Sequence, residues 1–305
     1  MTRVVITGPT GAIGLALINY YMAKNVEVIA ICRENSSRIS HIPQGENVKI
    51  YECNLENICD FNINLECDVF FHLGWDGTIG PGRNDIMVQS KNVEYAIECV
   101  RLAKRLKCKK FVGIGSQAEY GIQNSKLSSD MPVNPQTAYG AAKCCASLLT
   151  RMEAENLGME QCWARVLSVY GPGDGNRTLI SSVITGLLED NRVPLTEGIQ
   201  KWDYLYSGDA AKLLDLIACK GRHGEVYVLG SGSERPLREY VDIIAKELDR
   251  KELLDYGKIP YGAQSVMYLC ADTLKLTEEL GFTDFVPFEI GIKDTIEWIK
   301  MRETQ

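Results

Sequence analysis

The segment TGPTGAIG (residues 7–14) constrains the fold of this chain more than any other stretch of its sequence. It follows the apolar run RVVI (3–6) and opens a stretch with helical spacing, AIGLALINYYMAK (12–24). Between a strand and a helix, Gly8 allows a tight turn, Gly11 lets a pyrophosphate approach the backbone, and Gly14 lets the helix pack closely on the strand. The pattern predicts a dinucleotide-binding turn, whose helix directs unpaired N–H groups at the phosphates. The remaining residues expected to contact the cofactor here are Thr10, Ala12 and Ile13.

The first half of the chain alternates between strand-like and helix-like patterns. Apolar runs that resemble buried strands are VEVIAICR (26–33), NVKIYEC (47–53), CDVFFHLGW (67–75), KKFVGIGS (109–116) and EQCWARVLSVYG (160–171). Helical spacing covers roughly 85–107 and 137–157, and this alternation is typical of a parallel sheet covered on both faces. We therefore expect an α/β fold with a Rossmann-type doubly wound parallel sheet. The domain of this sheet covers 1–168, with 205–222 returning to it, and a smaller α/β substrate region covers 169–204 and 223–305.

Composition excludes several classes of partner. The 305-residue chain has a net charge of −7, and its densest positive stretch, KRLKCKK (104–110), lies where a helix is expected to end. Nucleic-acid and membrane-surface partners are therefore not expected. No stretch is apolar enough to span a bilayer, and no signal peptide is expected, because the first residues run directly into a strand. Eleven cysteines without a C-x-x-C motif and three scattered histidines favour free thiols in the cytoplasm and no metal site.

The end of the second strand bears on the choice of cofactor. An acid that would bind a free ribose is expected there, but Cys32 takes that place and Arg33 follows it. An arginine can pair with a 2′-phosphate, which a carboxylate would repel. The sequence therefore favours NADP, with Arg33 as a contact, over NAD; the alternative is that Arg33 is only a surface charge.

A second motif carries the chemistry. Tyr139 and Lys143 lie one turn apart on the helix expected over 137–157, and Ser116 ends the strand before it. A nearby ammonium stabilises a phenolate, so we expect the pKa of Tyr139 to fall towards the working pH. An alcohol or carbonyl reaction needs such a proton carrier, and Ser116 can hydrogen-bond the same substrate oxygen.

Together these segments resemble the extended short-chain dehydrogenases/reductases that act on nucleotide sugars. The resemblance covers nearly the whole chain and rests on TGPTGAIG, FFHLGW, GSQAEYG, YGAAK, RVLSVYGPGD and WDYLYSGDAA. It implies that Tyr139 exchanges the proton, that Lys143 holds the nicotinamide ribose, and that Ser116 orients the sugar oxygen. It also implies a homodimer through the helices near 85–107 and 137–157. Further cofactor contacts that it implies are Asn54, where many members carry Asp, with Leu55, Leu73, Gly74 and Leu167.

Departures from the family pattern narrow the reaction. Family dehydratases have an Asp–Glu pair after the fifth strand, where this chain has Gln117 and Ala118, so water elimination is not expected. Glu119 is shifted by one residue. Many epimerases have Arg where this chain has Trp202, which either stacks on a base or sugar or simply packs. The residues expected to contact the substrate are Trp75, Asp76, Gln117, Asn176, Arg177 and Trp202.

The interpretation that follows is an NADP(H)-dependent reductase of a nucleotide-activated 4-keto-6-deoxyhexose. Hydride would pass to the sugar C4 while Tyr139 protonates the oxygen. The alternative is an NAD-dependent nucleotide-sugar 4-epimerase, which oxidises and then re-reduces the same carbon. A non-catalytic dinucleotide-binding regulator fits less well, because a sensor has no need of a proton carrier. Neither the base nor the sugar is fixed by the sequence.

Overall fold

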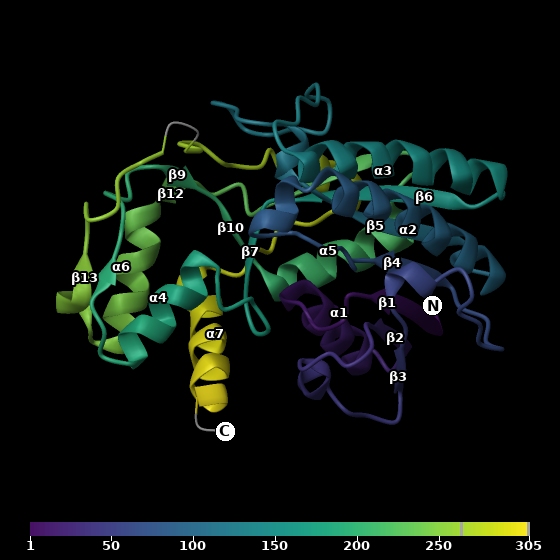
Figure 1. The fold of residues 1–305 in the computed structure, drawn as a ribbon, viewed down its shortest axis with the longest axis horizontal. Helices are drawn as coiled ribbons and strands as arrows, with labels where there is room; N and C mark the ends of the chain where they lie inside the picture. Colours follow the sequence, from purple (N-terminus) through teal and green to yellow (C-terminus); the bar gives the residue numbers. More distant parts are fainter. Residues whose placement is uncertain (263–264, 304–305) are drawn as a thin grey trace.

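A seven-stranded parallel sheet forms the centre of the computed structural model, which describes residues 1–262 and 265–303 (Figure 1). The strand order is β11-β6-β5-β4-β1-β2-β3. The predicted Rossmann-type sheet is therefore confirmed, and its order reverses next to β1, where ligands of such sheets bind. The strands are β1 Arg3–Thr7, β2 Glu27–Cys32, β3 Val48–Glu52, β4 Val69–His72, β5 Lys110–Ser116, β6 Glu160–Val166 and β11 Val226–Leu229.

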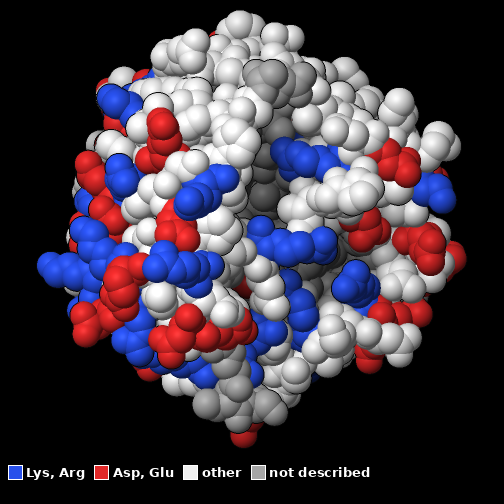
Figure 2. Space-filling model, turned by 60° about the vertical axis from the view of Figure 1, so that its left-hand side comes forward, with Lys and Arg blue, Asp and Glu red and all other residues white. Residues whose placement is uncertain are grey.

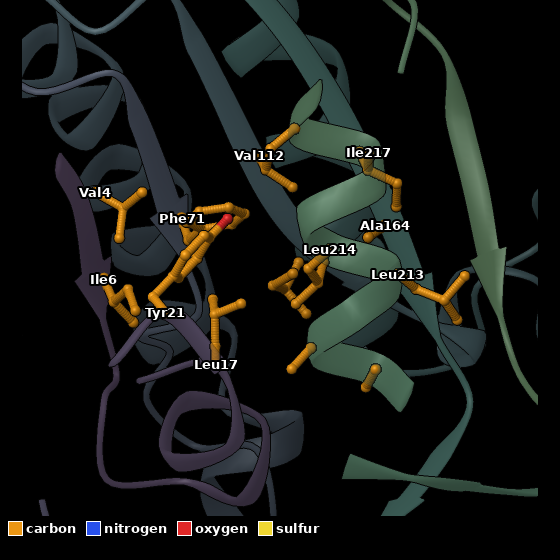
Figure 3. Close-up of a cluster of buried hydrophobic side chains, with 14 of the residues drawn as sticks. Val4, Ile6, Leu17, Tyr21, Phe71, Val112, Ala164, Leu213, Leu214 and Ile217 are labelled. Atoms are coloured by element: carbon orange, nitrogen blue, oxygen red, sulfur yellow. The ribbon is translucent and has the colours of Figure 1, made fainter. Parts of the chain in front are cut away.

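Helices cover both faces of this sheet because its strands alternate their side chains between two cores. On one face, Val4 and Ile6 of β1 belong to the core beneath α1 (Ala12–Ala23) and α5 (Ser207–Lys220). Figure 3 shows this core, with Leu213 and Leu214 of α5 among the labelled side chains. On the other face, Val5 belongs to the core beneath α2 (Ile86–Arg105) and α3 (Ala138–Asn156).

A second region lies beside the carboxyl ends of the strands, at the left of Figure 1. Its core is rich in aromatic residues, and the Phe288 ring contacts both Tyr170 and Tyr240. Its helices are α4 Leu179–Leu188, α6 Leu237–Leu248 and α7 Phe288–Glu303. Its strands pair as β7 Ser168–Tyr170 with β10 Tyr204–Tyr206, β9 Lys201–Trp202 with β12 Arg235–Pro236, and β8 Val193–Pro194 with β13 Leu254–Asp255.

Short helical turns complete the fold. They are the 3₁₀ turns η1 Ile39–His41, η2 Leu55–Asn57, η3 Pro81–Asn84, η4 Gln117–Glu119 and η5 Lys251–Leu253, and the π-helical turn η6 Leu276–Leu280. Two of them, η3 and η4, lie next to the residues described below as the candidate active site.

The structure differs from the sequence expectation at two places. The strand expected over 160–171 is broken at Leu167, whose N–H donates to the Leu229 carbonyl at 2.9 Å, and β7 beyond it pairs with β10 outside the main sheet. β6 is largely buried and β7 is partly buried, and the mainly apolar run that continues through both conceals the break. The segment 223–305 was expected in the second region, but β11 forms an edge of the main sheet because its buried side chains complete that core.

Candidate active site

The glycine turn between β1 and α1 has room for a ligand at one of its three glycines only. Gly8 has a φ of +67°, and a Cβ on it would lie 2.7 Å from the Gly74 nitrogen. A Cβ on Gly14 would lie 2.5 Å from the Gly8 carbonyl oxygen, whereas one on Gly11 would meet nothing closer than 3.9 Å. Gly11 is also the N-cap of α1, which has no side-chain cap, so its first N–H groups are available. The turn therefore fits the pyrophosphate of a dinucleotide.

This difference predicts opposite effects of two alanine substitutions. Gly14→Ala should destabilise the protein by about 1–3 kcal/mol, because backbone must move to admit the methyl group. Gly11→Ala should leave the melting temperature unchanged but weaken binding of the dinucleotide by roughly tenfold, because its methyl group occupies the open space. Thermal unfolding and a fluorescence titration with NADPH measure the two effects. Equal losses of stability in both variants would contradict this interpretation.

The structure brings the three expected catalytic residues together. Ser116 ends β5, and α3 carries Tyr139 and Lys143 one turn apart, its first turn capped by the Thr137 hydroxyl, which accepts from Gly140 N at 3.0 Å. All three catalytic candidates are buried. The Lys143 Nζ donates to the Ile114 carbonyl at 2.6 Å, and the Ser116 hydroxyl hydrogen-bonds the Tyr139 phenol.

The expected fall of the tyrosine pKa does not occur in this structure. Burial raises the pKa of Tyr139 above its ordinary value, against the opposing effects of the Ser116 hydrogen bond and the charge of Arg83. Burial also lowers the pKa of Lys143 to about 7. The prediction was wrong here because the same burial that brings the two groups together penalises the charged form of each.

The loop 74–85 lies directly against the catalytic pair. The Lys143 Nζ is 3.6 Å from the centroid of the Trp75 ring, and the Trp75 and Tyr139 rings meet edge to face at 6.3 Å. Arg83 is the other loop residue at the site, with its Cζ 4.3 Å from the centroid of the Tyr139 ring. The loop therefore places Trp75 at the site as expected, whereas the side chain of Asp76 is exposed.

The remaining expected cofactor residues lie at the carboxyl ends of the strands. Asn54 precedes η2 and donates its amide to the Glu34 carboxylate at 3.2 Å, with Leu55 beside it. Leu73 and Gly74 follow β4, and the Gly74 N–H donates to the Thr7 hydroxyl at 3.2 Å. Leu167 lies between β6 and β7. His72, at the end of β4, is buried and its pKa falls to about 3, so it packs as a neutral ring.

The side chain of Glu119 is engaged in buried hydrogen bonds that hold β5, β6 and η4 together. Its carboxylate is fully buried and accepts from the Arg165 Nε at 2.6 Å, from the Trp163 indole at 3.0 Å and from the Ser116 N–H at 2.9 Å. Because these donors occupy both oxygens, Glu119 is not a free acid for proton transfer. Gln117 and Ala118, which precede it in η4, have no ionisable group. The Asp–Glu pair expected of a dehydratase is therefore lacking at positions 117 and 118.

Three arginines gather at the end of β2. The guanidinium of Arg38 is half-buried and donates to the Gly173 carbonyl. Burial lowers the pKa of Arg38, and the positive charges of Arg302 and Arg33 lower it further, whereas the negative charge of Asp174 opposes them. None of the carboxylates whose side chains the structure describes lies within ion-pair distance of these arginines. Asp174 offsets part of this positive charge, and the excess that remains suits a dianion.

The expected substrate residues of the second region do not all lie together. Trp202 lines a cavity of about 400 Å³ with Tyr204 and Tyr256, and its indole also donates to the Ser168 hydroxyl at 2.8 Å. Arg238, stacked 4.0 Å from the centroid of the Tyr256 ring, is the cation of this cavity. Asn176 and Arg177 are exposed on the loop before α4.

Positive and negative side chains are distributed unevenly on the surface. Figure 2 shows a hollow near the centre of this face, and the charged side chains seen along it are mostly Lys and Arg, whereas Asp and Glu lie mainly farther out. Among the described residues, no three His, Cys, Asp or Glu side chains are placed to hold a metal ion. None of the described helices has the length and apolar character needed to cross a membrane.

The doubly wound sheet, the glycine turn and the buried Ser–Tyr–Lys set define a dinucleotide-binding protein of the dehydrogenase/reductase type. Comparison with known proteins agrees: residues 4–230 match the model of the NAD dependent epimerase/dehydratase family. The chain therefore belongs to this family and is an NAD(P)-dependent enzyme, which sets aside the non-catalytic alternative.

Relatives of full length carry two kinds of name. The chain is 24% identical to a dTDP-glucose 4,6-dehydratase of Streptomyces niveus, over 98% of this chain and 93% of the relative. It is 26% identical to a putative UDP-glucose 4-epimerase of Methanocaldococcus jannaschii, over 97% and 98% of the two chains. The fold matches the solved structure of a UDP-N-acetylglucosamine 4-epimerase from Methanobrevibacter ruminantium with a TM-score of 0.89, at 21% identity and 99% coverage of both chains.

Several residues at the site escaped the sequence analysis. Arg83 lies in the loop where Trp75 and Asp76 were expected to act, but no motif marks it. Gln89 and Asn92 are fully buried amides on α2 that hold the backbone of this loop. Two amides three residues apart, directly after a glycine-rich loop, are the signal that could have found them.

Proposed function

We propose that this enzyme is an NADPH-dependent reductase of a nucleotide-activated 4-keto-hexose. The observation that carries the proposal is the cluster of Arg33, Arg38 and Arg302, because Asp174 opposes only part of its positive charge and a 2′-phosphate would add the remaining negative charge. The engaged position of Glu119, with no acid at 117 or 118, argues against a dehydratase. More specifically, we propose that the hexose of the substrate is a 6-deoxy sugar, as expected from the sequence resemblance.

The catalytic residues divide the work of reduction. NADPH, when bound, supplies the hydride that adds to the carbonyl carbon at C4. Tyr139 then gives its proton to the carbonyl oxygen, while the Ser116 hydroxyl hydrogen-bonds the same oxygen. Lys143 lies beside Tyr139 and Ser116, and its Nζ would hold a hydroxyl of the nicotinamide ribose once its bond to the Ile114 carbonyl is released. We assign the nucleotide base to the aromatic cavity at Trp202, with Arg238 as a cation for its phosphates.

A nucleotide-sugar 4-epimerase is the second candidate, and the comparisons favour it. The relatives named as 4-epimerases match over the full length, and the family name specifies NAD. Such an enzyme uses the same three residues, with Tyr139 first accepting and then returning the proton at C4. It needs no added reductant, which separates it from the reductase in one assay.

The test is substrate-dependent loss of nicotinamide absorbance. We expect NADPH to be consumed with one of the common nucleotide 4-keto-6-deoxysugars, and NADH to be a poorer reductant. Arg33→Ala should raise the KM for NADPH by about tenfold and leave the KM for NADH unchanged, because it removes a charge-assisted hydrogen bond to the 2′-phosphate. Arg192→Ala is the matched control, since Arg192 is exposed and pairs with Asp255 at 2.7 Å.

Bound NAD with interconversion of two nucleotide sugars, and no consumption of NADPH, would replace the reductase by the epimerase.

We also propose that the enzyme is a homodimer through α2 and α3, because Leu148 and Met152 of α3 are half-exposed apolar side chains on this face.

A further inference from the structure

The loop 74–85 is fixed by two buried amides of α2. Gln89 and Asn92 are each only 1% exposed. The Asn92 side chain makes two bonds of 2.9 Å with the backbone of Asp76, one to its N–H and one to its carbonyl. The Gln89 oxygen accepts from the Trp75 indole at 2.9 Å, and its amide nitrogen donates to the carbonyls of Asp76, Gly77 and Gly82. A loop with so many buried hydrogen bonds presents its side chains in fixed positions.

Arg83 is one of the side chains that this loop presents to the site. Its Nη1 donates to the Thr78 carbonyl at 2.7 Å, and its Cζ lies 4.3 Å from the centroid of the Tyr139 ring. The neighbouring Asn84 accepts from the Ala138 N–H at 3.3 Å, which ties the loop to the first turn of α3. The guanidinium therefore lies over the ring of the catalytic phenol. Its position is fixed by its bond to the Thr78 carbonyl and by the bond between Asn84 and the first turn of α3.

Lys143 is farther from the same ring. Its Nζ lies 5.8 Å from the centroid of the Tyr139 ring, bonds the Ile114 carbonyl and faces the Trp75 ring. It also titrates near neutral pH, because burial lowers its pKa to about 7. A guanidinium keeps its charge at every working pH, so Arg83 supplies the permanent cation nearest to the ring.

The other groups that act on Tyr139 are accounted for. Ser116 hydrogen-bonds it from the end of β5 and favours ionisation, whereas the carboxylate of Glu119, on η4, opposes ionisation. Glu119 is itself paired with Arg165 on β6. On the side of β4, the charge of Lys143 adds to burial in keeping His72 neutral, so this histidine contributes no charge. Arg83 is thus the positively charged group that favours the phenolate in this arrangement.

We propose that Arg83 is a positioning residue for Tyr139: the loop holds its guanidinium on the phenol ring, where it stabilises the phenolate formed when the proton is transferred. This inference rests on the proposed function, in which Tyr139 is the proton carrier. It assigns the glycine-rich loop an electrostatic role in addition to that of a wall of the substrate site.

Removal of the charge should raise the pKa of Tyr139 by about one unit, the effect of one cation at this distance. In reduction Tyr139 must be protonated, so activity falls as the pH rises through its pKa. In Arg83→Gln this fall should therefore move about one unit to higher pH, whereas Arg83→Lys should keep most of the wild-type profile. A loss of packing alone would lower kcat without moving the profile.

A second measurement needs no substrate. Tyrosine is replaced throughout by 3-fluorotyrosine, whose ¹⁹F signal reports ionisation, and Tyr139→Phe identifies the signal of residue 139. The titration is made with NADP⁺ bound, in wild type, Arg83→Gln, Arg83→Lys and the control Arg192→Gln. A higher pKa in Arg83→Gln alone supports the proposal even if no tested sugar is reduced. An unchanged pKa in Arg83→Gln overturns it, whether or not the enzyme proves to be a reductase.

Discussion

Tyr139→Phe is expected to reduce turnover by about 10²–10⁴-fold while the protein still binds its dinucleotide. The substitution removes only the hydroxyl that transfers the proton. The phenyl ring remains to pack against Arg83 and Trp75, so the loop 74–85 keeps its contacts. Steady-state rates of NADPH consumption, together with a dinucleotide titration of the same sample, measure the two properties separately.

Tyr20→Phe is the matched control, because Tyr20 lies on α1 and its hydroxyl donates to the Asp215 carboxylate of α5 at 2.8 Å rather than to any residue of the catalytic set. Its rate should equal that of wild type. If Tyr139→Phe retained most of its activity, the proton carrier would have to be sought elsewhere, and both the proposed function and the role of Arg83 would fail together.

Glu119→Ala is expected to lower the free energy of unfolding by about 3–5 kcal/mol. The substitution leaves the Arg165 guanidinium buried without its carboxylate, and it also removes the acceptor of the Trp163 indole and of the Ser116 N–H. Chemical denaturation measures the loss. Glu119→Gln keeps the shape and part of the hydrogen bonding, so its loss should be smaller.

The comparison pair is Lys107 and Glu66, which are exposed and in contact on the surface. Glu66→Ala should give no measurable change in stability, because exposed ion pairs contribute little. A Glu119→Gln protein that was as stable as wild type yet inactive would mean that Glu119 transfers a proton, and it would reopen the dehydratase reading.

The sheet was predictable because each part of it has a local signature. Alternating strand and helix patterns predict a parallel sheet, and TGPTGAIG places its ligand at the end of β1. The helices expected over 85–107 and 137–157 became α2 and α3 within two residues at each end. That Tyr139 and Lys143 lie together on α3 was predictable for the same reason, since a spacing of four on a helix fixes their common face.

Other features depend on contacts between distant parts of the chain. Arg302, nearly at the end of the chain, lies near Arg38 because α7 packs beside the first region, and no pattern around either residue indicates this. The contact of Arg83 with Tyr139 depends on the path of a loop that buried side chains of α2 determine. The pKa of Tyr139 depends on how deeply the site is buried, which sequence spacing does not report.

The return of α5 and β11 to the sheet has a consequence for synthesis on the ribosome. The face of the sheet that holds Val112 and Phe71 is covered in part by Leu213, Leu214 and Ile217 of α5, and β11 adds the last strand (Figure 3). A nascent chain that has released only its first 168 residues therefore exposes an apolar surface to solvent or to a chaperone. The sheet can be completed only after residue 229 leaves the exit tunnel, so folding of the first region is coupled to translation of residues 169–229.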